Sequence, residues 1–363
     1  MKDGKLCVAL VGMSFGAEFI PIYLKHPQVE KLILVDHDEK QLHTMADKFL
    51  LEDYTTSYEE VLRDPEVDAI HLVIPPAFHA PMSIQALEAG KNCACTIPMG
   101  MNMEELKNII RARKTSGKHF MFMETSVYTR EYLYAKELYE TGQLGRIQYM
   151  NCAHYLDMEG WPEYWMGYPP LMHPTHAVAP CLALSGKRPV SVFGKGSGKV
   201  RPELTEKYGC PFAFESAFVT LEGDETVVEM ERFLYHVARE YSECFNIYGE
   251  KMSFEWAQLL EENPVVFTME KSENRGSTII SEHIEVPDYN HILPEEIRRF
   301  TRRTVYDESN PHLVNEFVQC IIQDRTPFPS DIDGAYWTAV GLLAHESAME
   351  GGTVKEVPVF ENI

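Results

Sequence analysis

The chain has 363 residues, of which 45% are hydrophobic and 24% charged, so it can form a packed core and is neither collagen-like nor largely disordered. A chain of this length usually divides into two domains. Its formal net charge is −22, and a surface of that sign repels nucleic acid and anionic membranes.

No segment has the pattern of a signal peptide or a membrane span. The first apolar stretch, residues 6–12, is too short for the core of a signal peptide, and nowhere do about eighteen apolar residues follow one another. The eight cysteines form no Cys-x-x-Cys pair, which favours reduced thiols. We expect a soluble, cytoplasmic protein that binds neither nucleic acid nor membrane.

The first third of the chain alternates short apolar runs with amphipathic segments. The runs predict buried strands, and the segments between them predict helices. Buried strands separated by helices form a parallel sheet with right-handed crossovers, so an N-terminal α/β domain with a doubly wound Rossmann sheet is predicted. The predicted strands are 6–11, 31–36, 69–74, 92–96 and 119–123, and the predicted helices are 15–25, 41–50, 81–88 and 103–116.

The pattern changes near residue 125, where we place the boundary between a domain of residues 1–125 and one of residues 126–363. After a predicted helix at 130–141, strands joined by short glycine turns predict an α+β domain with a large open, mostly antiparallel sheet. Two C-terminal helices, 311–323 and 334–351, are expected to pack back on the first domain. The predicted strands are 147–155, 190–195, 212–221, 226–235, 243–249 and 252–256.

A glycine-containing turn follows the first predicted strand and precedes the first helix. Gly12 suits the tight turn of a dinucleotide fingerprint, Ser14 stands where backbone meets pyrophosphate, and Ala17 suits close helix packing. The next strand ends at Asp36, which can accept ribose hydroxyls and repels a 2′-phosphate, so the pattern favours NAD(H). The alternative is a plain turn followed by a solvated acid. The candidate cofactor residues here are Gly12, Ser14, Phe15, Gly16 and Asp36.

Three further segments carry a family resemblance: Val73-Ile74-Pro75-Pro76-Ala77-Phe78-His79, Ala86-Leu87-Glu88-Ala89-Gly90-Lys91-Asn92 and Thr96-Ile97-Pro98-Met99. Together with the turn at 142–147, they make nearly the whole chain resemble the Gfo/Idh/MocA family of NAD(P)-dependent sugar and polyol oxidoreductases. The resemblance implies hydride transfer between nicotinamide and a carbinol carbon. It also implies that Pro75, His79 and Pro98 lie beside the cofactor, although His79 by itself would more often be a capping or core histidine.

Two family positions differ in this chain. The family's usual Glu-Lys-Pro is replaced by residues 96–98, where Ile97 cannot donate to the reacting hydroxyl as the family's lysine does. The second family motif has an aspartate and, four residues later, a histidine. His176 matches that histidine, and Met172 or His173 stands where the aspartate would be. By this resemblance, the chain therefore retains one of the family's two usual proton-handling groups, His176, and lacks the other, the lysine.

Oxidation of an alcohol requires a base for the hydroxyl proton, and His176 is the candidate. Pro174 suits the first turn of a helix, which would put His176 near a helix N-terminus, where the dipole favours the neutral ring. His173 could relay the proton or bind a sugar hydroxyl. A metal site formed by both histidines and Glu124 ranks lower, so no metal is expected. The remaining alternative is purely structural, with His173 capping the helix and His176 bonded to a backbone carbonyl.

Other polar and aromatic groups flank this segment. Glu124 would be a second base if buried and a solvated acid if exposed, and Tyr128 is a candidate substrate contact. The aromatic residues of a long loop either pack against a sugar or attach the loop to the core. These loop candidates are Trp161, Tyr164 and Trp165, beside Tyr168, while Arg232, His236, Arg239, Glu240 and Glu243 are possible substrate or subunit contacts without a fixed role.

We predict an NAD(H)-dependent oxidoreductase that converts a ring hydroxyl of a sugar or glycoside to a ketone, and the family resemblance favours C3. One alternative is a glycosidase that retains NAD and acts by transient oxidation and elimination. Another is a non-catalytic NAD-binding sensor or partner subunit. The half-apolar face of an open sheet favours association of several copies, so a homo-oligomer is expected.

Overall fold

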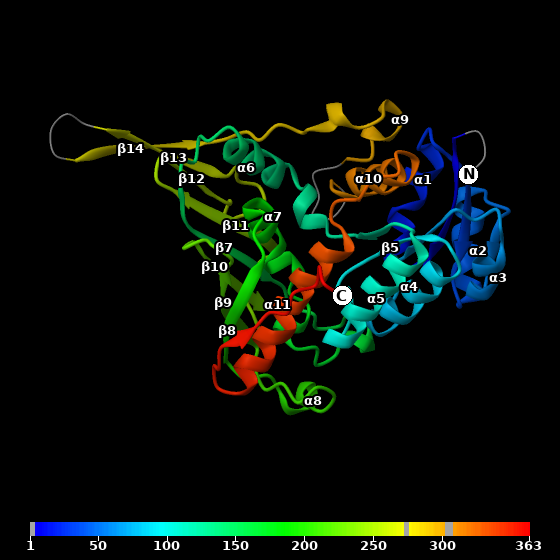
Figure 1. Ribbon diagram of the computed structural model, residues 1–363, viewed down its shortest axis with the longest axis horizontal. Helices are drawn as coiled ribbons and strands as arrows, with labels where there is room; N and C mark the ends of the chain where they lie inside the picture. The colour runs from blue at the N-terminus through cyan, green and yellow to red at the C-terminus, as the bar shows by residue number, and fades with distance from the viewer. Residues whose placement is uncertain (1–3, 272–275, 302–307) are drawn as a thin grey trace. The chain divides into compact units, whose positions relative to one another are not determined.

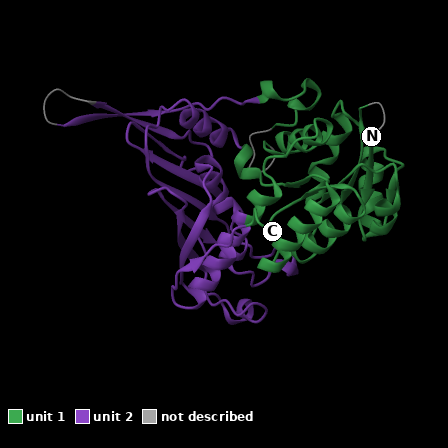
Figure 2. Ribbon diagram, in the orientation of Figure 1, with its two compact units in different colours: residues 1–128, 290–335, 360–363 green, residues 129–289, 336–359 purple. Residues whose placement is uncertain are grey.

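The computed structural model describes residues 4–271, 276–301 and 308–363. It divides the chain into two compact units (Figure 2). Unit 1 comprises residues 1–128, 290–335 and 360–363, and unit 2 comprises residues 129–289 and 336–359.

Unit 1 contains a six-stranded parallel sheet with the strand order β3-β2-β1-β4-β5-β6. The order reverses at β1, as in doubly wound folds, so the predicted Rossmann sheet is confirmed. The strands are β1 (Leu6–Val11), β2 (Val29–Val35), β3 (Tyr54–Thr55), β4 (Ala69–Leu72), β5 (Asn92–Cys95) and β6 (Phe120–Phe122).

The four helices predicted in the first third of the chain lie close to their predicted segments, except that the helix predicted at 15–25 is divided. Pro21 lies in the first turn of the second part, where its missing N–H costs no hydrogen bond. The elements are η1 (Phe15–Glu18), α1 (Ile20–Lys25), α2 (Glu39–Phe49), α3 (Tyr58–Arg63), η2 (Pro76–Phe78), α4 (His79–Glu88), α5 (Met103–Ser116), η3 (Thr125–Tyr128), η7 (Asn290–Ile292), α9 (Glu295–Arg298) and α10 (Asn310–Ile322).

The core of unit 1 combines the first strand with a helix from the C-terminal part of the chain. Leu6, Val8 and Leu10 alternate along β1 and are fully buried in one cluster with Leu313 and Phe317 of α10. The helices α1 and α10 lie side by side, as do α4 and α5 (Figure 1). A strand buried on both faces, like β1, is what a parallel sheet covered by helices requires.

Unit 2 contains a nine-stranded sheet with the order β14-β13-β12-β11-β7-β10-β9-β8-β15. Only β10 and β7 pair in parallel among its described strands, so the expected mostly antiparallel sheet is confirmed. The strands are β7 (Ile147–Tyr155), β8 (Pro189–Ser197), β9 (Phe214–Leu221), β10 (Val227–Phe233), β11 (Ser242–Gly249), β12 (Met252–Glu255), β13 (Val265–Lys271), β14 (Ser277–His283) and β15 (Lys355–Glu356).

Short helical elements contact this sheet and bring the candidate histidines to it. The turn η6 contacts β7, β10 and β11, and η5 contacts β9 and β10. Unit 2 has α6 (Arg130–Glu140), η4 (Glu163–Trp165), η5 (Pro170–Met172), η6 (Thr175–Ala177), α7 (Ala179–Ser185) and α8 (Pro202–Thr205), and α11 (Asp331–Met349) begins in unit 1. Within the described parts of the chain, no helix is both long and apolar enough to cross a membrane.

Candidate active site

The turn after β1 has a geometry that only glycine allows at position 12. Gly12 has a φ of +95°, and a Cβ there would lie 2.0 Å from the carbonyl oxygen of Val73. Its N–H donates to the Val35 carbonyl across the sheet (2.8 Å). The small residue thus brings the turn close to the neighbouring strand, as the first glycine of a dinucleotide fingerprint does. Of the other turn candidates, Ser14 precedes η1, Phe15 is 38% exposed, and Gly16 is buried.

Asp36 is a buried acid that holds this turn, so the alternative of a solvated acid is wrong. It is 6% exposed, its Oδ2 accepts from the Met13 N–H (2.6 Å), and its Oδ1 accepts from the Asp38 N–H (2.9 Å). The exposed His37 Nδ1 also lies 3.1 Å from Oδ1. A carboxylate offers about four acceptor sites, so these contacts leave capacity for a ribose hydroxyl. The turn and the carboxylate together fit the adenosine side of an NAD molecule.

His79 connects the segments that follow β4 and β5. It is the first residue of α4 and is buried, with Nδ1 2.6 Å from the Pro98 carbonyl and Nε2 2.7 Å from the Ile74 carbonyl. Burial lowers the pKa of His79, and a neutral ring can donate to one of the two carbonyls. Both ring nitrogens face main-chain oxygens, so His79 positions the segments that contain Pro75 and Pro98.

Two candidates lie at the end of β6. Glu124 is fully buried and accepts from the Ser126 N–H (2.9 Å), which rules out the solvated acid considered from the sequence. The Tyr128 hydroxyl donates to the Phe328 carbonyl (2.6 Å), and its ring stacks on His312 at 6.1 Å. Both side chains are therefore anchored within unit 1.

A row of buried polar residues crosses the sheet of unit 2. Glu215 of β9, Arg232 of β10, His154 of β7 and Glu243 of β11 are successive register partners. The first three are at most 2% exposed, and the side chain of Glu243 is 8% exposed. Ordinary sheet cores are apolar, so four such groups in one row mark a site built for polar chemistry.

His176 reaches this row from η6, and one detail of the sequence prediction is wrong. Pro174 precedes the short turn η6 instead of entering a helix, and α7 begins only at Ala179 with Pro180 in its first turn. His176 therefore lies outside the helix whose dipole was expected to favour the neutral ring. The turn ends before α7 because Val178 has a φ of −147°, which is not helical.

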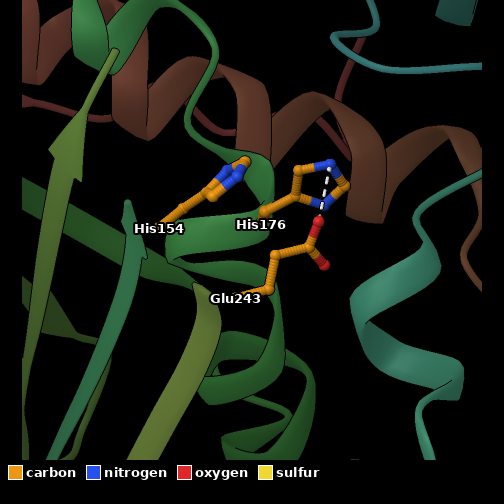
Figure 3. A group of neighbouring side chains, drawn as sticks. All are labelled: His154, His176 and Glu243. Carbon is orange, nitrogen blue, oxygen red and sulfur yellow. Dashed lines mark ion pairs between the residues drawn. The ribbon is translucent and has the colours of Figure 1, made fainter. Parts of the chain in front are cut away.

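Arg232 and Glu243 each contact histidines of the cluster. Arg232 donates through Nη2 to His173 Nδ1 (2.9 Å) and through Nη1 to His154 Nδ1. His176 Nε2 lies 3.5 Å from Glu243 Oε1, which also accepts from the Tyr241 hydroxyl. The rings of His154 and His176 meet edge to face, 5.0 Å apart (Figure 3).

The pKa of His154 is lowered well below its usual value, chiefly by burial and then by the positive charge of Arg232. Ligand atoms of His154, His176 and Glu243 lie within 4.8 Å of one another, a spacing that a metal ion could bridge. A second group with this spacing is formed by Cys210, Glu215 and His345. In that group, Glu215 already accepts from the Leu171 N–H (2.8 Å) and pairs with His345 (2.7 Å), so it serves to hold η5.

The aromatic loop combines both roles considered from the sequence. Tyr168 is buried, and Trp165 packs edge-on against it and against His173 at ring distances of 5.2 and 5.0 Å. Trp161 and Tyr164 are 43% and 38% exposed. Trp165 and Tyr168 therefore attach the loop beside His173, whereas Trp161 and Tyr164 remain available to a ligand.

Sequence reasoning missed His154 and Tyr241 and treated Arg232 and Glu243 only as possible substrate or subunit contacts without a fixed role. Arg232 and His154 are aligned by the parallel pairing of β10 with β7, and Glu243 is aligned with His154 by the pairing of β11 with β7, which no local pattern specifies. Of the other three unassigned residues, His236 accepts from the Arg201 N–H (3.4 Å), Arg239 donates to the Gln258 carbonyl (2.5 Å), and Glu240 is exposed.

Two family models match the chain. The model of the Gfo/Idh/MocA oxidoreductase family, NAD-binding Rossmann fold, matches residues 6–124, and the model of its C-terminal alpha/beta domain matches residues 136–355. Together they cover most of the chain.

Individual curated proteins are similar to this chain at low sequence identity. A glycosyl hydrolase family 109 protein of Stenotrophomonas maltophilia (strain K279a) is 18% identical over 353 residues, covering 84% of this chain and 75% of the relative. An uncharacterized oxidoreductase of Rhizobium meliloti is 27% identical over 132 residues, covering 36% of this chain and 39% of the relative. The second match thus spans well under half of that relative.

Solved structures share the fold over nearly the whole chain. Levoglucosan dehydrogenase in complex with NADH and levoglucosan has a TM-score of 0.81 at 19% identity, covering 98% of this chain and 100% of that one. Myo-inositol 2-dehydrogenase from Lactobacillus plantarum has a TM-score of 0.76 at 20% identity, with the same coverage. At such identities the likeness shows a common fold.

Proposed function

The chain belongs to the Gfo/Idh/MocA oxidoreductase family, and from this premise we propose that it is an NAD-dependent dehydrogenase that oxidises a ring hydroxyl of a sugar or glycoside to a ketone. The observation that carries the proposal is the His176–Glu243 pair, which is buried in unit 2 and supplied with a further hydrogen bond by Tyr241. A histidine oriented by a carboxylate is the usual construction of a general base.

His176 removes the proton of the reacting hydroxyl. Glu243 beside Nε2 favours the ring orientation in which Nε2 carries a proton, so the lone pair of Nδ1 receives the new one. The carboxylate then stabilises the imidazolium until the proton leaves for solvent. NAD held by the residues of unit 1 would supply the hydride acceptor, so that loss of the hydride from the carbinol carbon and of the hydroxyl proton to His176 would leave a carbon–oxygen double bond.

The residues of unit 1 fit the cofactor. Gly12 allows the close backbone approach, and the buried Asp36 carboxylate can accept ribose hydroxyls while repelling a 2′-phosphate. His79 holds the two segments that contain Pro75 and Pro98. These features support NAD over NADP.

The substrate in this proposal is neutral and rich in hydroxyl groups. Ile97 stands where the family usually has a lysine, so the positive charge of that lysine is missing, and the chain carries a net charge of −22. Exposed Trp161 and Tyr164 can pack against the apolar face of a sugar ring. Proteins of similar fold include a levoglucosan dehydrogenase in complex with levoglucosan and a myo-inositol 2-dehydrogenase. The preference for C3 rests on family resemblance.

The second candidate function is glycoside cleavage with NAD retained. Glycosyl hydrolase family 109 proteins among the relatives favour it. Transient oxidation of the hydroxyl by NAD would acidify the C–H next to the new ketone, and loss of that proton would expel the aglycone by elimination. After water adds to the resulting double bond, the bound NADH would reduce the ketone back to the hydroxyl and so restore NAD. The same histidine base serves both reactions.

A panel of sugars and glycosides separates the two functions. The purified protein is incubated with NAD, and absorbance of NADH, product mass and released aglycone are followed together. Dehydrogenation gives NADH and a product lighter by two hydrogens. Aglycone release without net NADH supports the glycosidase, and NAD binding without turnover of any panel member contradicts both.

We also propose that the protein acts as a cytoplasmic homo-oligomer. Apolar side chains such as Phe218 and Val227 are 45% and 40% exposed on the sheet of unit 2, and association would bury them. Light scattering of the purified protein tests this, and a monomer at micromolar concentration would contradict it.

A further inference from the structure

We infer that Arg232 is a positioning residue that fixes His154 and His173 as hydrogen-bond donors through Nε2, and that the His154 donor binds an oxygen atom of the substrate while His176 acts as the base. The assignment of the two ring forms rests on geometry alone. Its use in catalysis rests on the proposed function.

The guanidinium group of Arg232 faces one nitrogen of each ring. Arg232 is fully buried, and its Nη2 and Nη1 donate to Nδ1 of His173 and Nδ1 of His154. An arginine has five N–H donors and no acceptor, so each ring nitrogen that it faces must present a lone pair. A neutral imidazole with a lone pair on Nδ1 carries its proton on Nε2. Both rings are therefore donors on their far side.

The contacts with Arg232 also determine the charge of the two rings. An imidazolium has protons on both nitrogens and could accept nothing from Arg232, so the two contacts require both rings to be neutral. Burial and the adjacent guanidinium act in the same direction on His154, whose pKa lies well below the usual value. The cation in this cluster is thus Arg232 itself.

The Nε2–H group of His154 is a buried donor. His154 is 2% exposed, and its buried Nε2 has no hydrogen-bond partner within the described parts of the chain. Leaving a buried N–H without an acceptor costs about 1–3 kcal/mol. The His154 ring lies edge to face with that of His176, so an oxygen that accepts from His154 would lie beside the proposed base. A sugar hydroxyl or the ketone formed from it has the required lone pairs.

The same geometry argues against a metal ion at His154, His176 and Glu243. A metal bound to Nε2 of His154 needs a lone pair there, which would move the proton to Nδ1 and against the Arg232 donors. The buried positive charge of Arg232 opposes a second cation further. The cluster has the spacing of a metal site and the proton arrangement of an oxygen-binding site.

The ring forms are tested directly on the unmodified protein. Histidine is labelled with ¹⁵N, and long-range proton–nitrogen spectra are recorded near pH 7, with His154→Gln and His173→Gln identifying the two rings. We expect an unprotonated Nδ1 and a protonated Nε2 in both. A protonated Nδ1 in either ring overturns the inference.

Two variants of Arg232 test its role. Arg232→Lys keeps the charge but has one donor group in place of a fork, so at least one ring should lose its fixed form. Arg232→Met removes both the charge and the donors, and should allow the cluster to bind Co²⁺, seen by visible absorption, whereas the unmodified protein should not. Co²⁺ bound by these residues in the unmodified protein contradicts the inference. Arg146→Lys, at an exposed position of unit 2, is the control.

Activity provides the link to catalysis. In folded Arg232→Lys, we expect kcat to fall by about tenfold or more and its pH profile to change, with NAD affinity unchanged. If the histidine spectra of Arg232→Lys change while its kcat and pH profile stay the same, the catalytic role inferred for the two rings is overturned. If the unmodified protein turns over no sugar yet shows the expected ring forms, the proposed function fails while the role of Arg232 in fixing the rings stands.

Discussion

At the scale of single residues, the buried side chains of Asp36 and His79 have defined partners, and those partners specify what each can do. Asp36 accepts two main-chain N–H groups of its own neighbourhood, and His79 faces two main-chain carbonyls. Residues that the sequence suggested as ligand contacts therefore also shape the backbone around the ligand. Substitutions at these positions should change both binding and local structure.

Replacing Asp36 by Asn should weaken the preference for NAD. The amide keeps the size of the side chain but loses the charge that repels a 2′-phosphate, and one of its ends presents N–H groups to the Met13 or Asp38 donors. We expect the ratio of the NADP and NAD dissociation constants, measured by fluorescence titration, to fall by about tenfold or more. Asp38→Asn makes the same charge change at the N-cap of α2, where Asn is an equally good cap, and should leave the ratio unchanged. A preference of the unmodified protein for NADP would contradict the role of Asp36.

His71 should make unit 1 less stable in acid. It is fully buried in β4, its Nδ1 lies 3.0 Å from the Tyr23 hydroxyl, and burial lowers its pKa to about 3. Below pH 6.5 the unfolded chain binds a proton that the folded chain excludes, so the free energy of unfolding falls as pH decreases, by up to about 1.4 kcal/mol per pH unit.

The histidine contribution is isolated by comparing variants in urea titrations at pH 7 and pH 5. His71→Gln should be less stable at pH 7, yet its loss of stability between the two pH values should be smaller than that of the unmodified protein by about 2 kcal/mol. His43→Gln, at an exposed position of α2, should leave the pH dependence unchanged. Equal slopes for His71→Gln and the unmodified protein would show that His71 does not titrate in this way.

At the scale of elements, the strand–turn–helix unit at the start of the chain depends on one glycine. A Cβ at Gly12 would overlap the Val73 carbonyl oxygen at 2.0 Å, and its φ of +95° is already unfavourable for other residues. Gly12→Ala should therefore lower the free energy of unfolding by about 3 kcal/mol or more and weaken NAD binding. Gly90→Ala has a similar φ of +75° with no atom within 4 Å, so it should cost only about 1–2 kcal/mol and leave NAD affinity intact. Equal losses in the two variants would contradict the role of the close approach.

The sequence predicted the fold well wherever burial is periodic. The strands β1 and β7 and the helix α5 have the bounds expected from their apolar patterns. The strand β14 was missed because all its residues are exposed, so no face of it carries an apolar pattern. The short strand β3 and helix α3 were missed because two and six residues give too little periodicity.

The candidate site could be predicted only where a motif is local. The turn at Gly12, the carboxylate Asp36 and the histidine pair His173 and His176 each stand out in a short segment. The neighbours His154 and Arg232 are 78 residues apart and meet through strand pairing. Register between distant strands depends on the packing of the whole sheet, so it could not be predicted from one sequence.

At the scale of the whole molecule, the net charge of −22 favours neutral substrates. A sugar phosphate should have a lower kcat/KM than its parent sugar, because like charges reduce both encounter and binding. The difference should narrow as ionic strength rises from 0.1 to 1 M, where the screening length falls from about 10 to about 3 Å. Steady-state kinetics on such a pair checks this, and a phosphate that is preferred at low salt would contradict it.

The most direct test of the central claim is a single-turnover measurement of NADH formation with a sugar that the panel identifies as a substrate, comparing the unmodified protein with His176→Gln. Both proteins are saturated with NAD, and binding is verified by calorimetry. We predict NADH and an equal amount of ketone from the unmodified protein, and a rate lower by at least about 10² for His176→Gln at unchanged NAD affinity. A rate within a few-fold of the unmodified protein would contradict the assignment of His176 as the base.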